Sequence, residues 1–139
     1  MIEETSAGIV LFRIEESKKL FLLLNYPSGH WDFVKGKMEK GESIHQTAIR
    51  ETKEETGITD ITFVENFQEW IKYDFKYQGQ LVKKEVVFLL GETKTKEIKI
   101  SHEHTGYTWM DYNSAMEKTT FDNAKTVLTK AQKLLSNTL

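Results

Sequence analysis

Three glutamates lie close together in one predicted helix, at Glu51, Glu54 and Glu55. At 100° of rotation per residue, their side chains fall within an arc of about 100°, so one edge of the helix holds all three. Like charges at this spacing repel one another, and Lys53 points away from that edge. A divalent cation would balance them, since carboxylate oxygens suit Mg²⁺ or Mn²⁺. Magnesium commonly shares its ligand shell with substrate phosphates, so the pattern indicates metal-assisted attack on a phosphate chain.

A solvated acidic face is the ordinary interpretation of an isolated Glu-x-x-Glu-Glu. Here the glutamates belong to a longer pattern, Gly-x5-Glu-x7-Arg-Glu-x2-Glu-Glu-x-Gly. Its seven fixed positions are Gly36, Glu42, Arg50, Glu51, Glu54, Glu55 and Gly57. At a background usage of roughly 5–7% per residue type, such a match arises by chance in about one chain in 10⁶. The whole pattern therefore favours a function over a charged surface.

This pattern resembles the signature of the Nudix hydrolases, with Thr52 at a position where the family has a bulky aliphatic residue and Ile58 as expected. The resemblance implies an α+β fold in which a mixed β-sheet is sandwiched between helices. It also implies metal-dependent hydrolysis of a nucleoside diphosphate linked to another group. The implied metal ligands are Glu51, Glu54, Glu55 and a backbone carbonyl at Lys35 or Gly36, with Glu42 as an outer ligand. Arg50 would orient a carboxylate through a charge-assisted contact.

Other segments resemble the asymmetric dinucleoside tetraphosphate hydrolase subgroup of this family. The segment Ser101-His102-Glu103-His104 is followed by Tyr107 and Trp109, as in that subgroup. His30-Trp31 precedes Lys35-Gly36, although Val34 replaces the subgroup's proline, and the run 21–24 also matches. The resemblance then covers most of the chain.

The same resemblance assigns further site residues. Glu103 would bind metal or accept a proton from water, and His102 or His104 would contact phosphate. For each histidine the alternative is a loop residue bonded to backbone. The candidate phosphate contacts among the lysines are Lys35, Lys37 and Lys83. Tyr73 and Phe121 would stack on adenine, the alternative being that both belong to the core.

The elements that must position these residues can be read from the chain. Residues 7–12 and 20–24 predict two strands joined by a long loop. Ser43, with Gln46 three residues later, forms a capping box for a helix over residues 43–56, which ends at Gly57. Its predicted core stripe consists of Ala48, Ile49, Thr52 and Thr56. Residues 68–77 and 82–90 predict a second hairpin, with a short strand from residue 61 and another over 97–100. Residues 112–139 predict a short helix and then a longer one, whose apolar stripe includes Val127, Leu128 and Leu135.

Composition limits the remaining possibilities. A length of 139 residues predicts one domain spanning 1–139, and 39% hydrophobic residues are enough for a core. The chain has no cysteine, which excludes disulfides, Cys-zinc sites and thiol catalysis, and favours a cytoplasmic protein. Its net charge of −2 weighs against nucleic acid as a partner. No apolar run is long enough for a membrane span, and no obligate protein partner is evident.

We therefore expect a magnesium-dependent enzyme, with Mn²⁺ as a possible substitute, that hydrolyses the small molecule diadenosine tetraphosphate to ATP and AMP. Another activity of the family is the first alternative: removal of pyrophosphate from RNA 5′ ends or sanitation of nucleoside triphosphates. The second alternative is a domain that binds nucleotides without hydrolysing them. The intact Arg50, Glu51, Glu54 and Glu55 argue against this last possibility.

Overall fold

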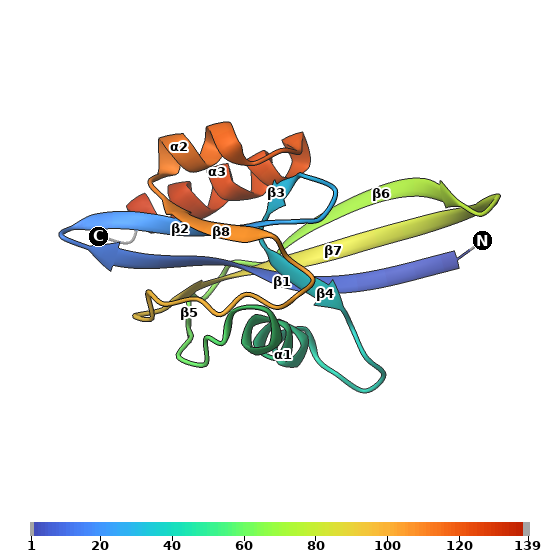
Figure 1. Cartoon of the computed structure of the whole chain (residues 1–139), viewed down its shortest axis with the longest axis horizontal. Coiled ribbons are helices and arrows are strands. Elements are labelled where there is room, and N and C mark those ends of the chain that lie inside the picture. The colour runs from blue at the N-terminus through green and yellow to red at the C-terminus, as the bar shows by residue number, and fades with distance from the viewer. Residues whose placement is uncertain (1, 138–139) are drawn as a thin grey trace.

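The computed structural model describes residues 2–137 and contains, within that range, eight strands and three helices around one sheet (Figure 1). The strands are β1 (Ile2–Glu15), β2 (Lys18–Asn25), β3 (Trp31–Asp32), β4 (Val34–Lys37), β5 (Thr62–Phe63), β6 (Glu69–Tyr77), β7 (Gln80–Glu92) and β8 (Gly106–Met110). The helices are α1 (Ile44–Thr56), α2 (Tyr112–Lys118) and α3 (Asp122–Asn137). None of the helices in the described range is long and apolar enough to cross a membrane.

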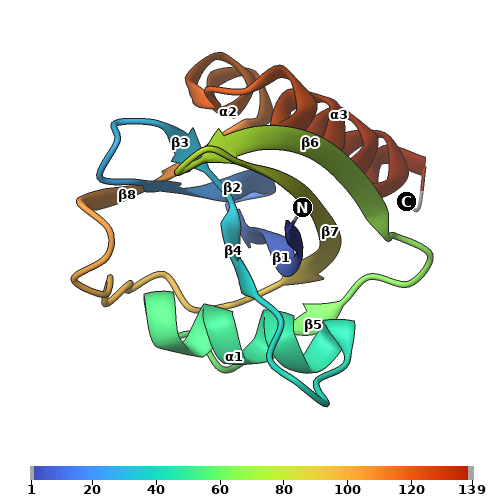
Figure 2. The same cartoon turned by 90° about the vertical axis from the view of Figure 1, so that its right-hand side faces the viewer.

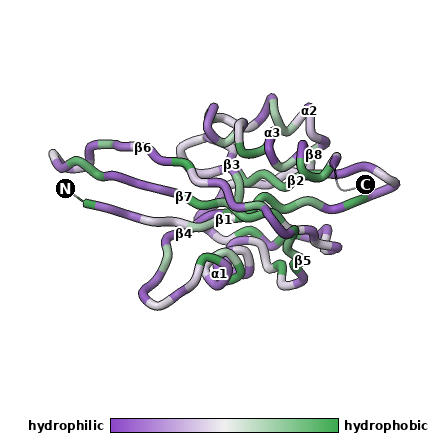
Figure 3. Tube along the Cα trace, turned by 180° about the vertical axis from the view of Figure 1, so that it is seen from behind, coloured by the Kyte–Doolittle hydropathy of each residue, from purple (hydrophilic) through white to green (hydrophobic). Residues whose placement is uncertain are grey.

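The long strand β1 organises the sheet. It pairs in parallel with β7 and antiparallel with β2 and β4, while β6 extends the sheet beyond β7. Helix α1 covers one face and helices α2 and α3 cover the other (Figure 2). Each side has its own apolar core, and the central parts of β1, β2 and β7 are the most hydrophobic segments (Figure 3). The predicted α+β architecture, a mixed sheet between helices, is confirmed.

Helix α1 begins and ends where the sequence predicts. The Ser43 hydroxyl accepts a hydrogen bond from the Gln46 backbone N–H at 3.1 Å, and the Ser43 N–H donates to the Gln46 side chain at 2.9 Å. Gly57 ends the helix with φ of 79°, a left-handed conformation that glycine adopts at low cost. The predicted core stripe is wrong at Ile49, which is exposed. The helix is rotated so that Thr47 and Glu55 are buried instead, which turns Glu55 toward the site.

Two loop predictions are corrected. The β1–β2 connection is a tight turn, because Glu16 and Ser17 both take positive φ values of 49° and 69°, which match the twist of a two-residue hairpin. Residues 97–100 form no strand. The N–H groups of Lys99 and Ser101 donate instead to the carbonyls of Thr56 and Glu55, at 3.0 and 3.2 Å. This pairing ties the loop after β7 to the last turn of α1.

Candidate active site

A groove of about 350 Å³ lies where β4, α1, β7 and the loop before β8 meet. It is lined by Glu4, Ser6, Tyr26, Lys35, Gly36, Lys37, Glu51, Glu55, Lys84, Glu103 and His104. The sequence-predicted residues in this list come from segments far apart in the chain. The tie between the 99–101 backbone and the end of α1 is what brings Glu103 and His104 beside the helix.

Gly36 is required because Glu51 packs directly against it. A Cβ atom at Gly36 would lie 1.9 Å from Cδ of Glu51, far inside van der Waals contact. The φ of Gly36 is not positive, so the glycine supplies space at this position rather than an unusual backbone conformation. The Glu51 carboxylate therefore lies against Gly36 of β4, the residue whose carbonyl is a predicted metal ligand.

Glu55 is a buried carboxylate with an unsatisfied oxygen. The residue is 5% exposed, and its Oε2 atom has no hydrogen-bond partner. The nearest cationic candidate is Nε2 of His104 at 4.0 Å, which is also buried and unpaired. Burial, and after it the negative charge of Glu51, raises the pKa of Glu55 to about 9. Burial lowers the pKa of His104, so at neutral pH this histidine is uncharged and offers Glu55 no ion pair.

Arg50 holds three carboxylates in place. Its guanidinium donates to Glu42 at 2.7 and 3.0 Å, to Glu51 at 2.8 Å and to Glu54 at 3.3 Å, and it also contacts the Lys37 carbonyl at 2.9 Å. The hydrogen bonds from Arg50, followed by the backbone N–H of Glu39, lower the pKa of Glu42 to about 2. Both oxygens of Glu42 are thus occupied by protein donors, and Glu42 does not line the groove. The outer-ligand role predicted for Glu42 is not supported.

The groove fits a divalent cation. Glu51, Glu55, Glu103 and the Gly36 backbone converge on it, and the unpaired oxygen of Glu55 lacks a counter-charge. Glu54, also predicted as a ligand, does not line the groove: it lies on the same edge of α1, with a side chain that is 57% exposed and bonded to Arg50. Among residues 2–137, no three acidic or histidine side chains are already clustered closely enough to form a complete metal site. A cation would therefore have to draw these hard oxygen ligands together.

A second pocket, of about 530 Å³, adjoins the groove. Tyr73 from β6 and Phe121 before α3 both line it, as the resemblance predicts for residues that stack on a base. Tyr26 and His30 add a stacked pair of rings with centroids 4.6 Å apart, and the His30 ring lies 5.1 Å from that of Phe121. Four of the nine residues that line this pocket carry rings, and Tyr26, Lys35 and Lys84 are shared between it and the groove.

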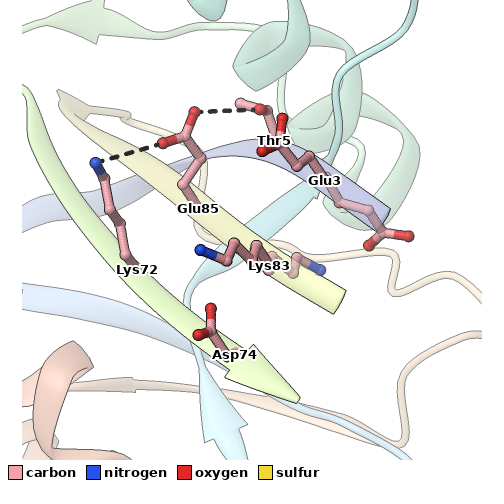
Figure 4. A pocket seen from close by; sticks show the side chains of 8 residues that line it. Glu3, Thr5, Lys72, Asp74, Lys83 and Glu85 are labelled. Carbon is pink, nitrogen blue, oxygen red and sulfur yellow. Dashed lines mark hydrogen bonds and ion pairs between the residues drawn. The ribbon is translucent and has the colours of Figure 1, made fainter. Parts of the chain in front are cut away.

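The structure does not bring Lys83 to the site. In the β6–β7 hairpin, Tyr73 pairs with Lys84, whereas Lys83 pairs with Asp74. Successive side chains in a strand point to opposite faces, so only Lys84 shares a face with Tyr73. Lys83 points to the other face with Glu3, Lys72 and Glu85, in a charged hollow whose edge Glu4 and Lys84 also line (Figure 4). The predicted phosphate contact is corrected from Lys83 to Lys84, which is half-buried and whose pKa is lowered by that burial.

The remaining predicted residues are divided between the site and the surface. Lys35 lines both pockets and pairs with the buried Asp32 at 3.0 Å. Lys37 lies at the rim of the groove, 3.5 Å from Glu4. His104 is buried and packs edge-on against Tyr26 at 4.6 Å, a structural contact at the groove wall. His102 is exposed and lines neither pocket, so the structure does not support a phosphate contact there.

Sequence reasoning missed Tyr26, His30, Asp32 and Lys84. The signal for Lys84 was the turn at Gln78 and Gly79, since a two-residue turn pairs Tyr77 with Gln80 and hence Tyr73 with Lys84. Tyr26 carries no such local signal, because its place depends on a hydrogen bond from its hydroxyl to the Phe33 carbonyl at 2.6 Å.

Comparison with known proteins agrees with this geometry. Residues 3–131 match the NUDIX domain family. The chain is 32% identical over 145 residues to an asymmetrical bis(5′-nucleosyl)-tetraphosphatase of Mus musculus, covering 96% of each chain. It is 33% identical over 100 residues to an RNA pyrophosphohydrolase of Nitratiruptor sp., covering 66% of this chain and 64% of that one. The crystal structure of a C. elegans Ap4A hydrolase binary complex matches with a TM-score of 0.81 and 30% identity, covering 96% of this chain and 98% of that chain.

Proposed function

This chain belongs to the Nudix family, and from that membership we propose that it hydrolyses diadenosine tetraphosphate asymmetrically, giving ATP and AMP. One observation carries the proposal: a carboxylate groove and an aromatic pocket adjoin each other and share Lys35 and Lys84. Aromatic rings suit the stacking of a nucleobase, lysines suit contacts with a phosphate chain, and carboxylates suit the binding of a divalent cation. A dinucleoside polyphosphate supplies the base and the phosphate chain in one molecule, and its phosphates would share the cation with the carboxylates.

The residues would divide the work as follows. Tyr73 and Phe121 would hold an adenine between them, and Lys35 and Lys84 would contact the phosphates that run from the pocket into the groove. The Mg²⁺ ligands would be Glu51, Glu54, Glu55, Glu103 and the Gly36 carbonyl. A bound cation of this kind neutralises phosphate charge and lowers the pKa of water. Arg50 would keep Glu51 and Glu54 oriented through the contacts already described.

The proton of the attacking water needs an acceptor within the groove. Glu103 projects from the loop before β8, is exposed to solvent and lines the groove, so it would accept this proton or bind the cation. Water would attack the phosphorus that becomes the phosphate of AMP, and ATP would leave.

Removal of pyrophosphate from RNA 5′ ends is the second candidate, favoured by the RNA pyrophosphohydrolase relative. That relative matches only 66% of this chain, whereas the tetraphosphatase relative matches 96%. A turnover panel with diadenosine tetraphosphate, 5′-triphosphorylated RNA and nucleoside triphosphates separates the candidates. We expect the highest kcat/KM for diadenosine tetraphosphate. Measurable binding without turnover in the presence of Mg²⁺ would instead indicate a nucleotide-binding domain.

The position of cleavage is tested in ¹⁸O-labelled water. We expect the label in AMP and none in ATP. Two molecules of ADP from diadenosine tetraphosphate would reject asymmetric cleavage. Label in ATP would preserve the products but move the attack to a different phosphorus.

A further inference from the structure

The sheet continues past the aromatic pocket as a projecting end made of β1, β7 and β6 (Figure 1). Glu4, Lys84 and Tyr73 are register partners and form the row of residues at the site. The next row on the same face, two residues along each strand, is Ile2, Val82 and Phe75. We call this second row the outer shelf.

The outer shelf is apolar, yet much of it is open to solvent. Val82 is 3% exposed, while Ile2 and Phe75 on either side are each 39% exposed. Single exposed apolar side chains are ordinary in soluble proteins. Here they form a continuous surface from the aromatic pocket, since the ring of Phe75 lies 6.2 Å from that of Tyr73 with an interplanar angle of 32°.

The opposite face of the same projecting end is charged. It carries Glu3, Lys72, Asp74, Lys83 and Glu85, of which Lys72 and Glu85 form an ion pair at 3.9 Å (Figure 4). The apolar side chains of the outer shelf therefore lie on the face that bears Tyr73 and Lys84. Their surface continues the proposed binding site rather than a core between sheet and helix.

Diadenosine tetraphosphate, the substrate of the proposed function, has a second base that must bind outside the aromatic pocket. The role inferred for the outer shelf rests on that proposed function. With one base at Tyr73, the phosphates would pass Lys84 and reach the groove beside Glu4, which belongs to the row adjacent to the shelf. Rows on one face of a strand lie about 7 Å apart, close enough for a nucleoside joined to the last phosphate. Lys35, Lys37 and Lys84 line the groove together with four glutamates, so these lysines and a bound cation would jointly supply the positive charge that a bridging phosphate chain requires.

We propose that the outer shelf binds the second nucleobase of the dinucleotide, with the Phe75 ring stacked on the base and Ile2 packed at its edge. Stacking on an aromatic ring tolerates any base, because every base presents a π-face. The shelf would thus favour dinucleotides over mononucleotides of equal phosphate length without selecting adenine.

The test uses Phe75→Ala in the full chain with two probes. One is diadenosine tetraphosphate as substrate, and the other is adenosine 5′-tetraphosphate, which has one base, as competitive inhibitor. We expect KM for the dinucleotide to rise about 5-fold or more while the inhibition constant of the mononucleotide stays unchanged. Phe75→Tyr, which keeps a ring, should behave like the wild type. Trp70→Ala is the matched control, since Trp70 lies on the same strand, is 42% exposed and points to the opposite face.

Three results would overturn the inference. If Phe75→Ala leaves both constants unchanged, the shelf binds no base. If both constants rise equally, Phe75 supports the first base through Tyr73. If the wild type does not hydrolyse diadenosine tetraphosphate with Mg²⁺ present, the proposed function is wrong, and the base-binding role of the outer shelf is rejected with it. Thermal unfolding of each variant identifies any loss that comes from misfolding, and Phe75→Leu then replaces Phe75→Ala.

Discussion

At the residue scale, two adjacent lysines on β7 point to opposite faces of the strand, Lys83 exposed and Lys84 half-buried. Lys84 lies beside Tyr73 in the site, and Lys83 points into the charged hollow behind it. We expect Lys84→Gln to raise KM for diadenosine tetraphosphate about 10-fold or more, as for the loss of a hydrogen bond to a charged group. Lys83→Gln should leave KM within about 2-fold of the wild-type value. Steady-state kinetics on both variants checks this, and an equal effect of the two would place the phosphates elsewhere.

Glu54 offers a test of the carboxylates that is separate from folding. Its side chain is largely exposed and bonds only to Arg50, so Glu54→Gln removes a charge without opening a cavity. We expect kcat to fall about 10²- to 10⁴-fold with little change in melting temperature. Glu117→Gln, at an exposed position on α2, is the control. Near-normal turnover by Glu54→Gln would remove this residue from the mechanism.

Single residues differ in how well the sequence predicts their place. The shared edge of Glu51 and Glu55 follows from helix geometry alone, because both side chains belong to one helix. The burial of Glu55 and its raised pKa do not follow, since they depend on segments distant in the chain: His104 lies 4.0 Å from the buried carboxylate, and the charge of Glu103 adds to the effects of burial and Glu51. The prediction that Lys83 contacts phosphate is wrong by one residue, and a shift of one residue along a strand moves the side chain to the opposite face of the sheet.

At the scale of elements, the contact between β4 and α1 determines where Glu51 can lie. Gly36→Ala would place a methyl group on the Glu51 carboxylate and force it, or the helix, to move. We expect activity to fall at least about 10²-fold, since small displacements of catalytic groups have effects of this size. Stability should fall by about 1–3 kcal/mol, as in overpacked sites.

Gly106→Ala is the control for that prediction. A Cβ at Gly106 would meet its nearest side-chain atom at 3.9 Å, an ordinary contact. Activity assays and denaturant unfolding on both variants separate the local clash from the general effect of alanine. Full activity of Gly36→Ala would show that Glu51 can leave this position at no cost.

The two rings expected to hold the base come from different elements, Tyr73 from β6 and Phe121 from the segment just before α3. If Tyr73 and Phe121 stack on adenine, replacing either by alanine should weaken substrate binding by about 1–3 kcal/mol. The loss should appear mainly in KM, because the contact is the same in the ground state and the transition state. Kinetics and thermal unfolding are measured together. Lower stability with unchanged KM would show that the ring serves only the core.

Elements with strong local signals were predicted well, and those without were not. The start and end of α1 follow from Ser43, Gln46 and Gly57, whose effects are confined to one turn of chain. The segment 97–100 looks like a strand in isolation. It fails to form one because its backbone donors reach the end of α1, a contact that no local pattern reveals.

At the scale of the whole molecule, folding concentrates negative charge in the groove at a cost to stability. Glu55 ordinarily has a pKa of 4.5, which burial and Glu51 raise to about 9. Between pH 4.5 and about pH 9, Glu55 keeps its proton in the folded chain and releases it in the unfolded chain. The free energy of unfolding therefore falls as pH rises through this range, by at most about 1.4 kcal/mol per pH unit for one proton. The lowered pKa values of Glu42 and His104 act below pH 6.5, whereas the lowered pKa of Lys84 acts below 10.5 and makes stability rise with pH. The contribution of Glu55 is therefore measured as the difference between the wild type and Glu55→Gln.

A cation bound at the carboxylates would reverse this trend, because it stabilises the ionised form. We expect denaturant unfolding with EDTA present to show stability decreasing from pH 7 to pH 9, and Mg²⁺ to restore more of it at pH 9 than at pH 7. In Glu55→Gln, which has no proton to lose, both the decrease and its reversal should be much smaller. Catalysis should follow the same logic and improve toward alkaline pH, where the carboxylates are ionised. If the wild type and Glu55→Gln show the same pH dependence across pH 7–9 without metal, Glu55 is already ionised in the folded chain at pH 7, and the groove tolerates its charge without a cation.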